Sequence, residues 1–258
     1  MRQNLGQHFL KNSAAIKKIV ASLGPREETV IEIGPGRGSL TKPLAEACAK
    51  SACKIFAIER DPALAEEARG WGLKNLEIIE DDALRALPAL ISGLRGKYKI
   101  VGNIPYYLTG FLLRTLGGLE PKPELIVLTV QKEVAERLTA RPPKMNRLAA
   151  SVQFWAEPKI ISALPRDSFS PPPEVDSAII SLSPTQKYRE TPPKTYYETM
   201  RALFAQPRKT IFNNLRGKST KSAKNLSTEL NKLGIDPGAR PQNLRVEDVV
   251  AIAKTLAG

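Results

Sequence analysis

The chain has 258 residues, of which 42% are apolar and 25% charged, the composition of a protein that buries a sizeable core. Its 39 lysines and arginines exceed its 26 aspartates and glutamates, so the formal net charge of +13 favours nucleic acid or an anionic membrane surface as a partner. One histidine excludes most His-dependent catalytic designs. Two cysteines, Cys48 and Cys53, are too few for a disulfide framework or a zinc site, which predicts reduced thiols and no bound metal.

The N-terminal segment is basic and contains the only histidine, His8. It has no apolar run of signal-peptide length, and no stretch of the chain reaches the roughly 20 apolar residues of a membrane span. We therefore expect a cytoplasmic protein without a membrane partner. A helix is predicted over Ser13–Leu23, and the arm before it is expected to close over a ligand and to contact nucleic acid.

Short β-branched runs alternate with helical stretches from Thr29 to Leu182, which predicts an α/β fold with a mostly parallel sheet. The seven predicted strands are Thr29–Ile33, Lys54–Glu59, Leu76–Ile79, Lys99–Gly102, Leu125–Val130, Ser151–Trp155 and Ser177–Leu182. The predicted crossover helices include Leu40–Ala49, Pro62–Gly70 and Leu108–Leu116. A proline-rich connection joins the last two strands, so we expect the sheet to end in an antiparallel pair.

After Leu182 the sequence has no strand-like run, and a proline-containing linker follows, which predicts two domains, residues 1–184 and 185–258. The helices predicted in the second are Lys194–Ala205, Arg208–Leu215, Ala223–Leu233 and Val246–Leu256. This domain also has a basic run without an acidic residue. The run comprises Arg201, Arg208, Lys209, Arg216, Lys218, Lys221 and Lys224. Solvated helix faces usually mix both signs of charge, so the run favours phosphate binding.

A glycine-rich turn of the form G-x-G-x-G follows the first predicted sheet strand and would let a ligand lie against the backbone of Gly34 and Gly36. Glu32, two positions before the turn, would repel a pyrophosphate and suits a cationic ligand. Glu59, at the end of the next strand, can accept hydrogen bonds from both hydroxyls of a ribose, and Asp82 adds an acceptor for an adenine amino group. S-adenosylmethionine meets these conditions; the alternative is a tight turn with solvated acids.

The segment Asn103-Ile104-Pro105-Tyr106 follows the strand Lys99–Gly102 at the same edge of the sheet. An exocyclic adenine nitrogen is a poor nucleophile because its lone pair is delocalised into the ring. Acceptors such as the Asn103 side chain and the Ile104 carbonyl could localise that lone pair, while Tyr106 could stack on an extruded base. A plain strand-to-loop turn is the alternative. Phe169, in the proline-rich loop, could form the opposite wall of the base site or be a core aromatic.

Together these segments resemble the KsgA family of ribosomal RNA adenine N6,N6-dimethyltransferases. The matching segments are Gly6–Leu10, Glu32–Gly36, Asn103–Tyr106, Gln131–Leu138, Phe169–Ala178, Arg208–Thr210 and Arg240–Leu244. The resemblance implies a Rossmann-like methyltransferase fold with a seven-stranded sheet and a small all-α, RNA-binding C-terminal domain. It implies a monomer that uses S-adenosylmethionine to dimethylate two adjacent adenosines in a hairpin near the 3′ end of 16S rRNA, in a small-subunit precursor.

The resemblance also implies roles for individual residues. The expected cofactor contacts are His8, Leu10, Gly34, Gly36, Glu59, Asp82 and Asn103, and the residues expected at the target adenine are Asn103, Tyr106 and Phe169. The loop Pro142–Ala149 departs from the family pattern because it lacks a Tyr-Gly pair.

Two alternatives stay open from the sequence. Methyltransferases that modify large-subunit rRNA share the glycine turn and the Asn-Ile-Pro-Tyr segment. A basic assembly factor without activity would explain the charge, although such a protein has no need of Glu59, Asp82 and Asn103.

Overall fold

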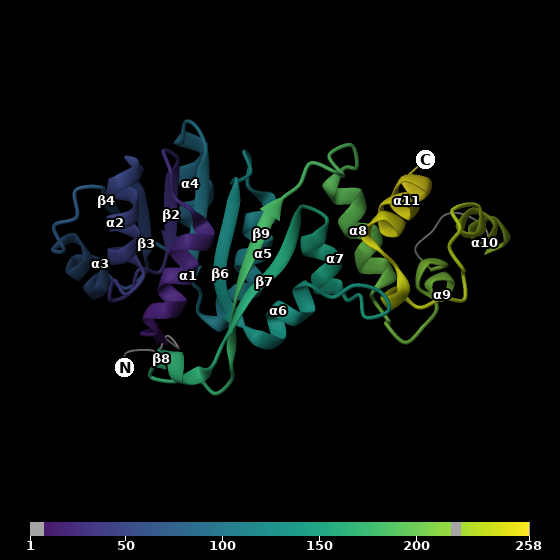
Figure 1. Cartoon of the computed structure of the whole chain (residues 1–258). Coiled ribbons are helices and arrows are strands. Elements are labelled where there is room, and N and C mark those ends of the chain that lie inside the picture. The colour runs from purple at the N-terminus through teal and green to yellow at the C-terminus, as the bar shows by residue number, and fades with distance from the viewer. Residues whose placement is uncertain (1–7, 218–222, 258) are drawn as a thin grey trace. The chain divides into compact units, whose positions relative to one another are not determined.

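The computed structural model describes residues 8–217 and 223–257 (Figure 1). The predicted motif residues Gly6 and Gln7 and the basic residues Lys218 and Lys221 lie outside these ranges. The chain divides into two compact units, one of residues 1–135 and 158–184 and one of residues 136–157 and 185–258. No helix within the described ranges is long and apolar enough to cross a membrane.

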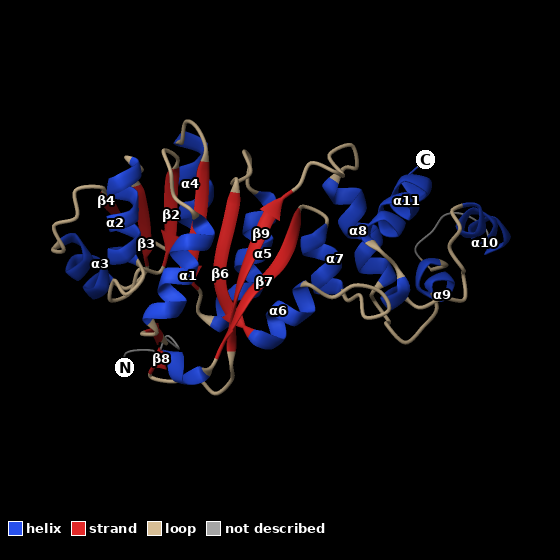
Figure 2. Ribbon diagram, in the orientation of Figure 1, coloured by secondary structure: helices blue, strands red, loops and turns tan. Residues whose placement is uncertain are grey.

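The first unit contains a seven-stranded sheet of order β4-β3-β2-β5-β6-β9-β7 (Figure 2). Its strands are β2 (Thr29–Ile33), β3 (Ile55–Glu59), β4 (Leu76–Glu80), β5 (Tyr98–Asn103), β6 (Leu125–Gln131), β7 (Ala156–Leu164) and β9 (Ser177–Pro184). The first five are parallel, and β9 runs antiparallel to β6. The predicted α/β class and mostly parallel sheet are therefore confirmed.

Helices connect the parallel strands, as in other parallel sheets whose two faces must both be covered. The connecting helices are α2 (Thr41–Ser51), α3 (Pro62–Arg69), α4 (Ala83–Gly93), η1 (Tyr106–Leu108) and α5 (Thr109–Gly118). Helix α1 (Ser13–Leu23) precedes β2, and α6 (Lys132–Leu138) follows β6. Asp61 and Asp82 cap the N-termini of α3 and α4 by accepting hydrogen bonds from backbone N–H groups. Because the strands are parallel, their strand-to-helix turns all lie at the carboxyl edge of the sheet, and the two caps start α3 and α4 shortly after their strands.

The prediction of a strand over Ser151–Trp155 was wrong. Residues Arg147–Gln153 form helix α7, and the strand β7 begins only at Ala156. The Asn146 side chain accepts hydrogen bonds from the N–H groups of Leu148 and Ala149, which is the N-cap contact that starts a helix. Pro158 obscures the strand in the sequence, but β7 is an edge strand, where a residue without an N–H group is tolerated.

A second, two-stranded sheet was not predicted. Strand β1 (Phe9–Leu10) pairs antiparallel with β8 (Phe169–Ser170), which follows the short helix η2 (Arg166–Ser168). The N–H group of Lys11 extends the contact by donating to the carbonyl of Ser168 at 2.9 Å. In Figure 1, β8 accordingly lies beside the start of α1. The N-terminal arm is thus held against the loop that carries Phe169.

The second unit is helical. Its elements are α7, α8 (Pro193–Leu203), α9 (Ile211–Leu215), α10 (Ala223–Lys232), η3 (Pro241–Asn243) and α11 (Val246–Ala257). Phe154, next to α7, stacks on Tyr196 of α8 with ring centroids 3.9 Å apart. This packing explains why residues 136–157 group with the helices of the second unit. The predicted division at residue 184 places these residues in the first domain, together with the sheet. That the two predicted parts are independent domains stays a prediction.

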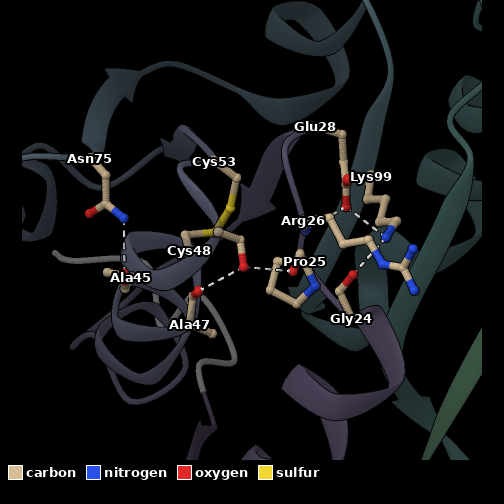
Figure 3. The surroundings of a disulfide bond; sticks show 11 residues. Gly24, Pro25, Arg26, Glu28, Ala45, Ala47, Cys48, Cys53, Asn75 and Lys99 are labelled. Atoms are coloured by element: carbon tan, nitrogen blue, oxygen red, sulfur yellow. Dashed lines mark hydrogen bonds and ion pairs between the residues drawn. A yellow bond between two sulfur atoms is a disulfide. The ribbon is translucent and has the colours of Figure 1, made fainter.

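The prediction of reduced cysteines was also wrong, because Cys48 and Cys53 form a disulfide (Figure 3). Ala52, at the end of α2, has a left-handed backbone with φ of 56°, which turns the chain back on itself. The N–H group of Cys53 then donates to the carbonyl of Cys48 at 3.1 Å, and the two Cα atoms lie 4.8 Å apart, within bridging distance. The number of cysteines alone does not indicate this turn, which is what brings the two thiols together.

Candidate active site

A cavity lies where β2, β3 and β5 end. It is lined by His8, Phe9, Leu10, Glu32, Gly34, Pro35, Gly36, Ser39, Leu40, Glu59, Asn103, Ile104, Pro105, Tyr106 and Phe169. Parallel sheets bind ligands at the carboxyl ends of their strands, and the cavity occupies that position. All its lining residues belong to the first unit.

The glycine turn forms one wall of the cavity. Gly34 and Gly36 have φ values of 70° and 55°, a left-handed backbone that disfavours other residues. A Cβ atom on Gly34 would meet no other atom within 4 Å, so the space beside this backbone is open. A Cβ atom on Gly36 would approach the Phe9 ring to 2.9 Å. The turn is thus bare on the ligand side at Gly34 and covered by the N-terminal arm at Gly36.

Glu59 is buried and joins the glycine turn to β3. Its Oε2 accepts a hydrogen bond from the N–H group of Gly36 at 3.1 Å, and its Oε1 accepts one from the N–H group of Asp61 at 2.9 Å. Each carboxylate oxygen has a further lone pair, so the group can still accept hydrogen bonds from a ligand. A carboxylate fixed at two points in this way is suited to the two hydroxyls of a ribose.

Glu32 is the second buried acid of the cavity wall. Its Oε2 has no hydrogen-bond partner among the described residues. Burial, reinforced by the nearby Glu59 carboxylate, raises the pKa of Glu32 to about 8, against the opposing effect of the Thr41 hydroxyl. An unpartnered buried acid is costly, and a cationic ligand would stabilise its charged form. The cavity thus combines an acceptor for ribose hydroxyls with an acid suited to positive charge.

Asn103 stands at the end of β5, next to the cavity. Its Nδ2 donates a hydrogen bond of 2.8 Å to the carbonyl of His8. Gly102 before it allows β5 to lie close to β2, because a Cβ atom there would come within 2.7 Å of the Ile33 carbonyl oxygen. A carbonyl can only accept, so this contact fixes the orientation of the Asn103 amide and leaves its oxygen available as an acceptor.

Two aromatic side chains line the cavity beside Asn103. The Tyr106 hydroxyl lies 2.7 Å from the Ser177 Oγ, and burial raises the pKa of Tyr106 above its usual value. Phe169 is buried in β8 and also packs in the hydrophobic core of the first unit. Phe169 therefore fits both interpretations left open by the sequence, a wall of the cavity and a core aromatic.

The structure brings together all the predicted site residues except one. His8, Leu10, Gly34, Gly36 and Glu59 line the same cavity as Asn103, Tyr106 and Phe169. Asp82 does not line it: its side chain accepts from the N–H group of Leu84 and lies 3.6 Å from the Arg60 guanidinium. Asp82 stands at the same sheet edge, but its role as a cofactor contact stays a prediction.

Sequence reasoning missed Phe9 and Ser177. Phe9 covers Gly36, and the Arg37 guanidinium lies 4.9 Å from the centroid of its ring. Ser177 holds the Tyr106 hydroxyl from the start of β9. Both belong to segments that match the family, Gly6–Leu10 and Phe169–Ala178, so the signal was present in the sequence. Their roles depend on contacts between separate segments, Phe9 with Gly36 and Ser177 with Tyr106, and could not be deduced from spacing.

The model of the ribosomal RNA adenine dimethylase family matches residues 1–258, the whole chain. The chain belongs to this family. It is 39% identical over 255 residues to ribosomal RNA small subunit methyltransferase A of Dehalococcoides mccartyi (strain ATCC BAA-2266 / KCTC 15142 / 195), covering 96% of this chain and 85% of the relative. The protein of the same name from Pelotomaculum thermopropionicum is 39% identical over 272 residues, covering 98% and 90%.

Solved structures of related enzymes agree with this membership. A dimethyladenosine transferase from Plasmodium falciparum superposes with a TM-score of 0.80 at 26% identity, covering 95% of this chain and 96% of that one. The 23S rRNA methyltransferase ErmE superposes with a TM-score of 0.72 at 23% identity, covering 97% of this chain and 100% of that one. This second similarity supports the fold alone. The predicted fold and enzyme class, an S-adenosylmethionine-dependent rRNA adenine dimethylase, are confirmed.

The residues of this ribosomal RNA adenine dimethylase fit its cofactor. Gly34 offers open backbone, Glu59 is suited to ribose hydroxyls, and Glu32 is a buried acid with an unpartnered oxygen. S-adenosylmethionine carries a ribose and a sulfonium cation, so both acids have a counterpart in it. When bound, it supplies an electrophilic methyl group. The assignment of each contact to a single residue stays a prediction.

Proposed function

We propose that this chain dimethylates the N6 amino groups of two adjacent adenosines in a hairpin near the 3′ end of 16S rRNA, within a precursor of the small ribosomal subunit. The family to which it belongs acts on adenine of ribosomal RNA, and the relatives from Dehalococcoides mccartyi and Pelotomaculum thermopropionicum are named as small-subunit methyltransferases. The observation that carries the proposal is the fixed amide of Asn103 beside a cavity with two buried acids.

The proposed chemistry requires a nucleophilic adenine nitrogen. The Asn103 oxygen and the Ile104 carbonyl would accept hydrogen bonds from the two amino hydrogens and draw the nitrogen lone pair out of conjugation with the ring. The Tyr106 ring would stack on the extruded adenine, opposite Phe169. The bound cofactor would supply the methyl group, its sulfur keeping the electron pair of the broken carbon–sulfur bond, and the methylated nitrogen would release its extra proton to solvent.

No side chain is needed as a general base in this scheme. Burial holds the Tyr106 hydroxyl in its protonated form, because the pKa of this group is raised above its ordinary value. The His8 Nδ1–H donates to the Pro171 carbonyl at 2.9 Å, a contact that positions the ring beside β8. We assign His8 to the positioning of the N-terminal arm.

The second unit supplies the proposed RNA-binding surface. Of the basic run, Arg201, Arg208, Lys209, Arg216 and Lys224 are described and exposed. Asn214 orders the turn that carries Arg208 and Lys209, because its Nδ2 donates to the carbonyls of Gln206, Lys209 and Thr210. Exposed cations on an ordered turn can contact phosphates without rearrangement. We propose that the enzyme acts as a monomer in the cytoplasm, where it would meet rRNA precursors.

The test is methylation of purified small-subunit and large-subunit rRNA precursors with S-adenosylmethionine, followed by mass spectrometry of the digested RNA. We expect two adjacent dimethyladenosines near the 3′ end of the 16S rRNA and none in the 23S rRNA. Modification of 23S rRNA alone would contradict the proposal and favour the large-subunit alternative. Binding without methylation of either RNA would favour the non-catalytic assembly factor.

A further inference from the structure

Two aromatic side chains next to the cavity lie in solvent. Tyr107 is 54% exposed and Phe111 is 59% exposed, the two highest values among the large apolar side chains of the described chain. They belong to η1 and α5, which follow Asn103 after two residues. Exposed single apolar residues are common, but two neighbouring aromatic rings beside a catalytic cavity suggest a binding surface.

Helical spacing places these rings on one face with a cation. Phe111 and Arg114 are three residues apart on α5 and so share one face, and Tyr107 lies four residues before Phe111 in the 3-10 turn η1, which leads directly into α5. The opposite face of α5 is buried through Leu112, Leu113 and Leu116. The exposed face is therefore fixed in direction by the core. We call Tyr107, Phe111 and Arg114 the aromatic stripe; it extends over about 10 Å at 1.5 Å per residue.

The surroundings of the aromatic stripe favour a polyanion with planar groups. The sequence has no acidic residue between Asp82 and Glu120. Arg114 forms no ion pair among the described residues, and the one acid that lines the same groove is Glu120, whose carboxylate is paired with Lys122 at 3.0 Å. Gly110 belongs to the same exposed face, and a Cβ atom there would meet nothing within 4 Å. The surface beside the rings is thus open, without side chains that would keep a flat base from stacking.

We propose that Tyr107 and Phe111 stack on unpaired nucleotides that flank the target adenosine, while Arg114 contacts the backbone phosphate. The proposal rests on the proposed function, because an adenosine extruded from a hairpin leaves its neighbours unstacked. Tyr106 lines the cavity and Tyr107 is the next residue, so the aromatic stripe begins one residue from the proposed base site, within reach of the nucleotides that flank the target. The aromatic stripe thus helps to select RNA in which the target is flanked by unpaired bases.

The test compares Tyr107→Ala, Phe111→Ala and the double variant with wild type on a hairpin RNA of the 16S 3′ end. Stacking is worth roughly 1–3 kcal/mol per base, so kcat/KM for RNA should fall about 5- to 150-fold per ring. Tyr107→Phe should retain the wild-type value, because the ring persists. The matched control is Ile160→Ala, which removes a large side chain that is 37% exposed on the edge strand β7 and should leave kcat/KM unchanged.

Further measurements separate this inference from the proposed function. Affinity for S-adenosylmethionine should be unchanged in every variant, which excludes misfolding. RNA affinity, measured by fluorescence anisotropy without methyl transfer, should fall in the alanine variants. This measurement tests the stacking role directly, even if the wild-type protein methylates no 16S rRNA. Unchanged RNA affinity and kcat/KM in the double variant would overturn the inference. A change in sedimentation coefficient with unchanged RNA affinity would also overturn it and make the aromatic stripe a protein interface.

Discussion

The side-chain amide of Asn103 is hydrogen-bonded to the backbone carbonyl of His8, 95 positions earlier in the sequence. His8 is held in turn by β1, which pairs with β8, and by its ring contact with Pro171. The N-terminal arm therefore does more than line the cavity. It orients the amide on which the proposed activation of the adenine amino group depends.

The first prediction follows from this contact. Asn103→Ala should lower the single-turnover rate of methyl transfer by about 10²-fold or more, the effect of removing one positioned polar group that acts on a transition state. RNA affinity should stay at the wild-type value. The rate is measured with radiolabelled S-adenosylmethionine, with the melting temperature as a control for folding. A rate within a factor of three of wild type would exclude the proposed role of Asn103.

The sequence predicted the site because its residues end neighbouring strands. Glu32, Glu59 and Asn103 lie at the carboxyl edge of a parallel sheet, and that edge follows from strand order alone. The contact between Asn103 and His8 could not be predicted, since it depends on the pairing of β1 with β8 far along the chain. The sequence around α7 was also predicted as a strand, because its local propensity does not distinguish the two. The aromatic partner of Phe154, at the end of α7, is Tyr196, which belongs to a later helix.

The second prediction concerns how the protonation of Glu32 affects the affinity for the cofactor. The pKa of this buried acid is raised to about 8, so it holds a proton at neutral pH when no ligand is present. A cation bound beside it favours the carboxylate, and binding should release a proton below pH 8. Affinity for S-adenosylmethionine should therefore rise with pH up to about 8 and then level off. Calorimetry in buffers of different ionisation enthalpy measures the number of protons released on binding. The variant Glu32→Gln should abolish this proton release.

The third prediction applies the same pKa to the stability of the protein without ligand. Between pH 4.5 and about 8 the folded state keeps a proton on Glu32 that the unfolded state has lost. The free energy of unfolding should consequently fall as pH rises through this window, by at most on the order of 5 kcal/mol from this group. Urea denaturation at several pH values tests this. Glu32→Gln should show a flatter dependence, and parallel curves for the two proteins would contradict the shift.

The fourth prediction concerns the disulfide. Replacing Cys48 and Cys53 by alanine should lower the free energy of unfolding by about 2 kcal/mol, the value expected for so short a closed loop. The pair lies at the end of α2 away from the glycine turn, so affinity for S-adenosylmethionine should change less than twofold. Alkylation followed by mass spectrometry should find no free thiol before reduction and two after it. Two free thiols in the untreated protein would show that the pair is reduced in solution.

The last prediction concerns Arg208 and Lys209, which lie on the turn ordered by Asn214. The double variant Arg208→Glu and Lys209→Glu should weaken RNA binding and make its salt dependence shallower, because each lost phosphate contact reduces the slope of log K against log salt by about 0.7–0.9. Affinity for S-adenosylmethionine should not change, since the cavity belongs to the other unit.

The matched control, Lys194→Glu with Lys254→Glu, changes the net charge by the same amount at positions outside the turn. Both measurements use fluorescence anisotropy at several salt concentrations. Equal slopes for the two double variants would show that only net charge matters and that the turn makes no specific phosphate contact.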